Sequence, residues 1–140
     1  MNAVKPLFFA MLSAFAGGLH AASPNMKEGL WEVTAHVAGD AATKPTTLQH
    51  CISHKDLQSP GKIAPGGAGG ACEIKDHRIQ GDVVSWAMSC NGRTPMTGSG
   101  SITFGETTYT GQSRLSVKQG NRTADMTVHY SGTYIGPCKK

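Results

Sequence analysis

The chain has 140 residues, of which 39% are hydrophobic and 16% charged, and its formal net charge is +4. This length suits one domain with a small core, and a mild charge carried by scattered basic residues argues against nucleic-acid binding. Glycine, serine and threonine are abundant, which favours strands and turns over helices.

The N-terminus has the features of an export signal. Lys5 precedes an apolar run over residues 7–16, which a glycine pair and small residues at positions 21 and 22 follow. The run is shorter than the roughly 20 apolar residues that span a bilayer, and no later segment predicts a transmembrane helix. We expect residues 1–22 to be a cleaved signal peptide and residues 23–140 to form one β-domain. Loss of Lys5 would lower the charge to +3. The expected location is periplasmic or secreted.

The first predicted elements lie between residues 31 and 70. In residues 31–37, apolar side chains alternate with polar ones, which is typical of a half-buried strand. Residues 53–57 predict a short helical turn. Residues 59–70, with two prolines and five glycines, predict a flexible loop.

The next element is a hairpin that carries two of the four cysteines. A turn at residues 81–82 joins the segment that starts at Cys72 to the alternating segment that ends at Cys90. The apolar face changes parity within the first segment, which predicts a β-bulge near residues 76–77. The resulting pairs are Ile79–Val84, Ile74–Met88 and Cys72–Cys90. Opposed strand positions lie within disulfide reach.

Three further segments, 96–104, 109–117 and 124–134, also alternate with period two. A turn at residues 105–106 and a loop at 119–122 set their predicted register. The pairs are Ile102–Tyr109, Gly100–Gly111, Val117–Ala124, Gly111–Tyr130 and Tyr109–Gly132. Tyrosine rings opposite glycines would shield the bare backbone.

These elements predict an all-β fold. We expect a single antiparallel, strongly curved meander sheet or partly open barrel of about six to seven strands, with one apolar and one polar face. Glycines on the inner face permit the strong curvature. Disulfides would staple the sheet.

An even number of cysteines in an exported chain indicates disulfides. The hairpin register favours Cys72–Cys90 and leaves Cys51–Cys138 by elimination. A simple up-and-down strand order, however, places Cys51 and Cys138 at opposite ends of the sheet. The alternative pairing is Cys51–Cys72 with Cys90–Cys138.

Few residues suggest catalytic chemistry. His50, Cys51 and His54 are metal-ligand types in a tight cluster, but an oxidised Cys51 would leave only two surface histidines. No nucleophile elbow, phosphate loop or zinc-protease motif is present. We therefore expect no catalytic residues, no metal, no cofactor and no enzymatic activity.

Four aromatic residues are candidates for ligand contact. Trp31, Trp86, Tyr109 and Tyr130 fall on the predicted inner face, where core packing is the alternative role. Space beside the two tryptophans would come from the small inner positions, which are Gly98, Gly100, Gly111 and Ser113.

The ordered set of motifs resembles a known family. The motifs are Met26–Val33, Cys51 with Asp56-Leu57, Cys72, Val83–Trp86 before Cys90, Tyr109–Gly111 and Ser131–Cys138. Together they resemble the bacterial exported family called domain of unknown function 3617. The resemblance covers residues 26–138 and implies an envelope protein of a Gram-negative bacterium. It supplies no catalytic residues.

Three functional hypotheses follow. The first is a non-catalytic binding or interaction module whose partner is an envelope protein. The second is a carrier that holds a small apolar ligand in a cavity of the curved sheet, and a hydrolase or metal enzyme ranks last. An open inner cavity would favour the carrier, whereas a filled core with an exposed apolar patch would favour a protein partner.

Overall fold

The computed structural model describes residues 23–38, 44–59 and 72–139. The signal peptide predicted at residues 1–22 and the loop predicted at residues 59–70, apart from Ser59, lie outside these described residues. The elements are β1 (Gly29–Val37), β2 (Thr46–Ile52), α1 (His54–Leu57), β3 (Cys72–Gln80), β4 (Val83–Cys90), β5 (Met96–Phe104), β6 (Thr108–Gln119) and β7 (Arg122–Gly136). No helix in the described part of the chain is long and apolar enough to cross a membrane.

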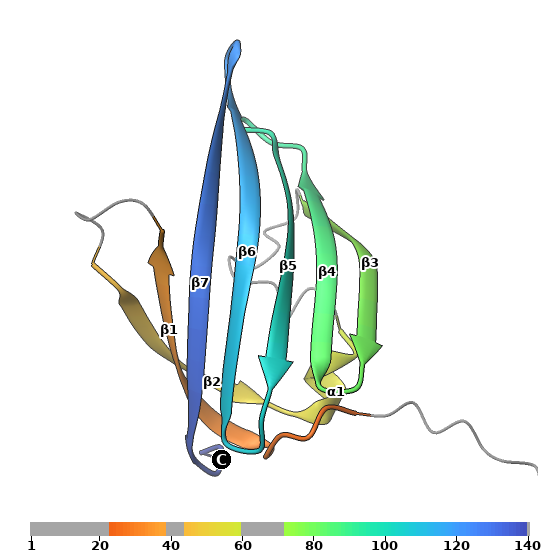
Figure 1. Ribbon diagram of the computed structural model, residues 1–140, viewed down its shortest axis with the longest axis vertical. Coiled ribbons are helices and arrows are strands. Elements are labelled where there is room, and N and C mark those ends of the chain that lie inside the picture. Colours follow the sequence, from red (N-terminus) through yellow and green to blue (C-terminus); the bar gives the residue numbers. More distant parts are fainter. Residues whose placement is uncertain (1–22, 39–43, 60–71, 140) are drawn as a thin grey trace, which may run out of the picture.

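All seven strands form one open antiparallel sheet, in the order β2-β1-β7-β6-β5-β4-β3 (Figure 1). The sheet is strongly curved, so that β1 and β2 curl behind the plane of the other strands. The predicted all-β class, antiparallel pairing and strand number are confirmed.

The strand order departs from the simple up-and-down order, because β1 pairs with β7. Strands β3 to β7 form a meander, while β1 and β2 extend its β7 side. Leu30 on β1 therefore lies opposite both Cys51 on β2 and Gly136 at the end of β7. This brings Cys51 and Cys138 together, with Cα atoms 5.7 Å apart in a disulfide. The second disulfide is Cys72–Cys90, so the favoured pairing is confirmed and the alternative pairing is wrong.

The register of the β3–β4 hairpin follows the prediction. The predicted pairs Ile79–Val84, Ile74–Met88 and Cys72–Cys90 are all present. The register shifts between Lys75 and Arg78, which confirms the bulge. Asp76 has a φ of 51° there, the one positive φ among non-glycine residues in the described chain.

The predicted register of β5 against β6 is wrong by two residues, and that of β6 against β7 is correct. The backbone N–H of Gly105 donates to the carbonyl of Thr108 at 2.7 Å, so the turn is centred one residue later than predicted. Ile102 consequently pairs with Gly111 and Gly100 with Ser113. A shift of two residues keeps every side chain on its predicted face, because strand side chains alternate with period two.

Strand β2 was not among the predicted strands. It is an edge strand, and its residues 46–51 are all exposed. Only Leu48 and Ile52 are apolar on its inner face, where His50 lies opposite Trp31. Period-two alternation is therefore weak in this segment.

The predicted helical turn is confirmed as α1. The hydroxyl of Ser53 accepts from the backbone N–H of Asp56 at 3.2 Å, and the Asp56 carboxylate accepts from the Ser53 backbone N–H at 3.0 Å. This capping box satisfies helix donors that would otherwise lack partners. It orients α1 so that Leu57 is fully buried against the sheet.

Candidate functional site

The concave face of the sheet is divided into two parts that differ in burial. One part, which we call the closed part, is a packed aromatic and aliphatic core. Its buried members are Met26, Trp31, Leu57, Val84, Trp86, Ile102, Phe104, Tyr109 and Tyr130. The Trp31 ring, with no exposed surface, lies 5.6–6.3 Å from the rings of Tyr109, Tyr134 and Phe104. These contacts hold β1, β7, β6 and β5 together.

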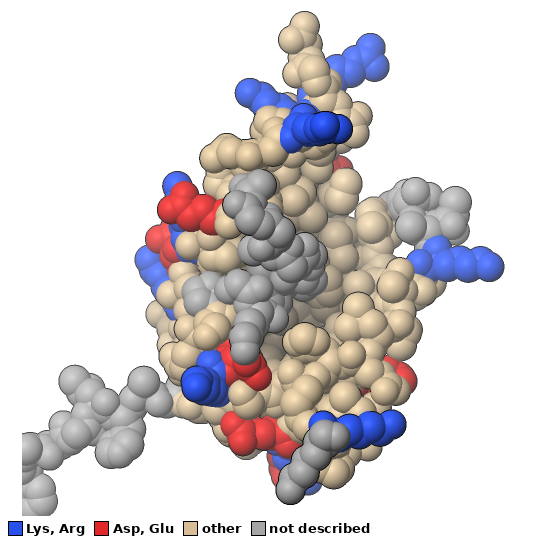
Figure 2. Space-filling model, turned by 180° about the vertical axis from the view of Figure 1, so that it is seen from behind, with Lys and Arg blue, Asp and Glu red and all other residues tan. Residues whose placement is uncertain are grey.

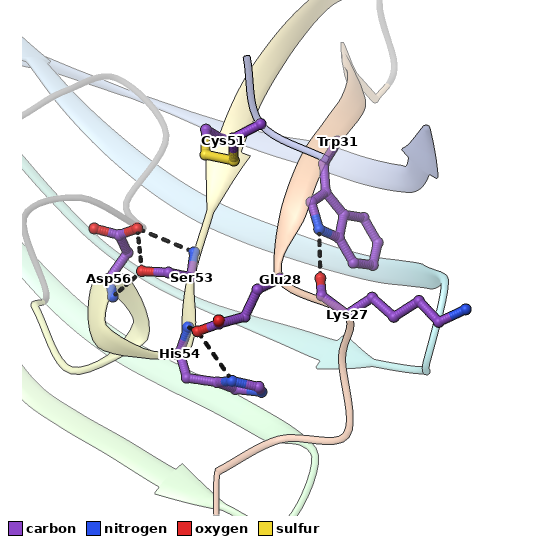
Figure 3. The surroundings of a disulfide bond; sticks show 8 residues. Lys27, Glu28, Trp31, Cys51, Ser53, His54 and Asp56 are labelled. Carbon is purple, nitrogen blue, oxygen red and sulfur yellow. Dashed lines mark hydrogen bonds and ion pairs between the residues drawn. A yellow bond between two sulfur atoms is a disulfide. The ribbon is translucent and has the colours of Figure 1, made fainter. Parts of the chain in front are cut away.

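The segment before β1 and α1 cover the end of the closed part (Figure 3). The indole N–H of Trp31 donates to the carbonyl of Lys27 at 3.0 Å. The Glu28 carboxylate accepts from the backbone N–H of His54 at 2.7 Å and lies 3.1 Å from its Nδ1. The covering segments are therefore tied both to the sheet and to each other.

The four aromatic residues predicted as ligand contacts all lie in the closed part. Trp31, Trp86, Tyr109 and Tyr130 are each at most 6% exposed. In this structure they therefore present almost no surface to a ligand, and they serve as core.

The glycines do not open a cavity beside the tryptophans, contrary to the expectation from their size. A Cβ added at Gly100 would lie 2.6 Å from Cζ2 of Trp86, and one at Gly98 would lie 2.6 Å from Cδ2 of Leu115. At Gly132 the obstruction is the Tyr109 ring, which confirms the predicted shielding of that glycine. Neighbouring side chains thus occupy the room that the missing side chains leave.

The other part of the concave face, which we call the open patch, is apolar but incompletely covered. It comprises Val128, at the β7 end of the Trp86–Gly100–Ser113 row, and the next row on the same face. Its members are Ile74, Met88, Leu115, Met126 and Val128, all only partly buried. Ile74 and Val128 also pack against the closed part. Figure 2 shows a hollow on this side of the molecule that is lined by uncharged residues, with Lys, Arg, Asp and Glu around its rim. Sequence periodicity placed these residues on the inner face but did not distinguish them from core.

Two polar atoms near the boundary of the two parts lack partners. Trp86 Nε1 and His77 Nε2 are buried and make no hydrogen bond in the described structure. On β4, Trp86 lies two residues before Met88 of the open patch. The bulge places His77 opposite Trp86 on β3. A buried donor or acceptor without a partner costs about 1–3 kcal/mol, so a ligand group that reached either atom would recover part of that cost.

The cluster of His50, Cys51 and His54 does not form a metal site. Cys51 is bonded to Cys138, His54 pairs with Glu28, and His50 is exposed on the edge strand. Among the described residues, no three His, Cys, Asp or Glu side chains come close enough to hold a metal ion.

Two buried tyrosines of the closed part, Tyr109 and Tyr130, have raised pKa values. Burial raises the pKa of Tyr109 above its usual value near 10, and the neighbouring Tyr130 raises it further. Burial also raises the pKa of Tyr130, although a hydrogen bond with Ser113 lowers it again in part.

These pKa shifts predict loss of stability in alkali. Both tyrosines hold their protons more tightly in the folded chain than in the unfolded chain. The contribution of these two protons to stability is therefore fully present below pH 10 and is lost as the pH rises above it. We expect the denaturation midpoint, measured from pH 8 to 11, to fall less steeply for Tyr109→Phe than for the wild type. Equal slopes for the two proteins would contradict the assignment.

Comparison with known proteins gives one match. A family model described as "Protein of unknown function (DUF3617)" matches residues 26–138. No curated protein matches the chain. No solved structure matches it either.

Proposed function

Since the chain belongs to the DUF3617 family, whose description assigns no activity, we propose a function from the geometry of this chain. It is an exported, non-catalytic binding protein that holds a small apolar ligand against the open patch of its concave face. The observation that carries this proposal is the division of one continuous apolar face into a packed part and a hollowed, partly exposed part.

The composition of the open patch supports a small ligand. Leu115 and Met126 form one cross-strand pair, and Met88 belongs to the same row two strands away. Methionine side chains are flexible and adapt to irregular apolar shapes. Removal of such partly exposed apolar area from water by a ligand stabilises the complex by about 25 cal/mol per Å².

The unpartnered polar atoms further suggest an amphipathic ligand. Trp86 Nε1 is a donor, and His77 Nε2 is a donor or an acceptor according to tautomer. A ligand with an apolar body and one oxygen-containing end would cover the patch, and its polar end would reach these atoms after a small side-chain movement, since both atoms are buried here. The filled core beside the tryptophans, taken alone, favours the competing hypothesis of a protein partner. The exposed apolar area is recessed and not flat, however, and a recessed surface suits a small molecule better than the face of a protein.

A fluorescent apolar probe tests the proposal. Binding of the neutral dye N-phenyl-1-naphthylamine to the chain without residues 1–22 should be saturable. We expect Met126→Glu to weaken the dissociation constant at least 10-fold, because it places a charge in the open patch. The matched control is Thr123→Glu, which puts the same charge on the outer face of the same strand and should leave binding unchanged.

Circular dichroism and thermal unfolding show whether each variant is folded. If Met126→Glu does not fold, the less disruptive Met126→Gln replaces it, with an expected weakening of a few-fold. Equal dye binding by wild type, Met126→Gln and Thr123→Glu would contradict the proposed location. A protein that co-purifies and blocks dye binding would favour the interaction module instead.

A further inference from the structure

The outer face of the sheet carries a polar groove of about 550 Å³, on the opposite side from the open patch. It crosses β3, β4, β5 and β6. Its middle is lined by the short side chains of Ser85, Ser99 and Ser101, and longer side chains stand at its two ends. The volume is within the range of small-molecule sites.

The strand register explains how this groove arises. Arg78, Ser85, Ser101 and Gln112 form one row across four adjacent strands. In the next row, Ser99 lies opposite Arg114. The two arginines thus stand on β3 and β6, with two strands of small residues between them. Three steps of about 4.8 Å separate these strands, so they lie about 14 Å apart.

Neither arginine of the groove forms an ion pair within the described chain. The ion pairs of the described residues involve Lys27, His54 and Lys75, and none involves Arg78 or Arg114. Guanidinium groups on strands bind carboxylate or phosphate through two parallel hydrogen bonds. Unpaired arginines beside a groove are therefore suited to an anionic ligand.

The β-bulge adds one acceptor at the β3 end. Asp76 lines the groove and adopts a φ of 51°, a backbone conformation that costs a non-glycine residue about 1 kcal/mol or more. Alternation puts Asp76 and Arg78 on one face and His77 on the other, and the bulge makes the face of Asp76 and Arg78 the outer one. Bulges often re-aim side chains at functional sites.

We propose that this groove binds a hydroxylated small molecule that carries a carboxylate or a phosphate, that is, a sugar acid or a sugar phosphate. Arg114 binds the oxyanion at the β6 end, and Arg78 donates to ligand hydroxyls at the β3 end. The serine hydroxyls and the Gln112 amide exchange hydrogen bonds with ligand hydroxyls, and the Asp76 carboxylate accepts from them. The inference is independent of the function proposed for the concave face.

Titrations followed by amide NMR spectra of the chain without residues 1–22 test this inference. The probes are D-glucuronate, glucose 6-phosphate, D-glucose and inorganic phosphate. We expect both anionic sugars to shift the amides of Ser99, Ser101 and Gln112, and the tighter of the two identifies the preferred oxyanion. D-glucose and inorganic phosphate should each bind at least 10-fold more weakly, since each supplies only half of the groups.

Matched variants locate the site. Arg114→Gln should weaken the anionic sugars at least 10-fold, whereas Arg122→Gln removes the same charge at the β6–β7 turn and should have no effect. Equal losses of affinity in both variants would show that net charge, and not this groove, controls binding, and this would overturn the proposal. It would also be overturned if inorganic phosphate bound as tightly as glucose 6-phosphate, if neither anionic sugar bound, or if the shifts fell on the concave face.

Discussion

Replacing both Cys51 and Cys138 with serine is expected to lower the free energy of unfolding by about 4–5 kcal/mol. The two cysteines are 87 residues apart in sequence, and a cross-link stabilises mainly by reducing the entropy of the unfolded chain, more so for longer loops. The same disulfide fastens the edge strand β2 to the chain that follows β7. Natural domains are stable by only about 5–15 kcal/mol, so the variant should be close to unfolding at 37 °C.

The Cys72–Cys90 disulfide provides the matched comparison. Its cysteines are only 18 residues apart, within one hairpin, so the paired serine variant should lose about 3 kcal/mol. Urea denaturation of both variants and the wild type measures the difference. A larger loss for the Cys72–Cys90 variant would show that strand geometry, and not loop length, controls the contribution of each disulfide.

Replacing Trp31 with alanine is expected to destabilise the protein by about 3–5 kcal/mol. Trp31 is fully buried, its ring contacts three other aromatic rings, and its indole N–H donates to the Lys27 carbonyl. The substitution would leave a cavity among β1, β5, β6 and β7 and would loosen the segment that covers this end of the sheet.

A second apolar residue on the same face serves as the control. Leu48 lies opposite Val33 on the edge strand and is 52% exposed. Leu48→Ala should therefore cost only about 1 kcal/mol, because about half of its surface stays in water on folding. Denaturation midpoints of both variants measure the contrast. A loss below 1.5 kcal/mol for Trp31→Ala would show that the aromatic cluster is not the anchor of the fold.

Local patterns predicted the parts of the fold that depend on neighbouring residues. The parity change between Ile74 and Ile79 identified the bulge, and with it the Cys72–Cys90 pair, because both follow from a period of two along one hairpin. The predicted β5–β6 turn is one residue too early, because glycine is common in turns and the prediction places Gly105 as a central turn residue. In the structure the chain reverses around Glu106 and Thr107.

The non-local features could not be read in the same way. The alternation of apolar and polar residues in β1 and β7 does not indicate that these strands pair. Together with the β1–β2 pairing, the β1–β7 pairing brings Cys51 to Cys138. Strand β2 escaped notice because an exposed edge strand needs few apolar residues.

The candidate site illustrates the same limit. Periodicity assigns a residue to a face but carries no information about depth. Trp86 and Met88 follow the same alternation on β4, yet Trp86 is buried in the core and Met88 is only partly buried. Depth depends on residues distant in the sequence, such as Met26 and Leu57, which pack into the closed part.

Native mass spectrometry of the protein, purified without detergent from cells that express all 140 residues, is the most direct test of ligand binding at the open patch. We expect a wild-type species that carries a small amphipathic molecule, the same species for Thr123→Glu, and a bare mass for Met126→Glu. A bare mass for the wild type, or a bound molecule that Met126→Glu retains in full, would contradict ligand binding at the open patch.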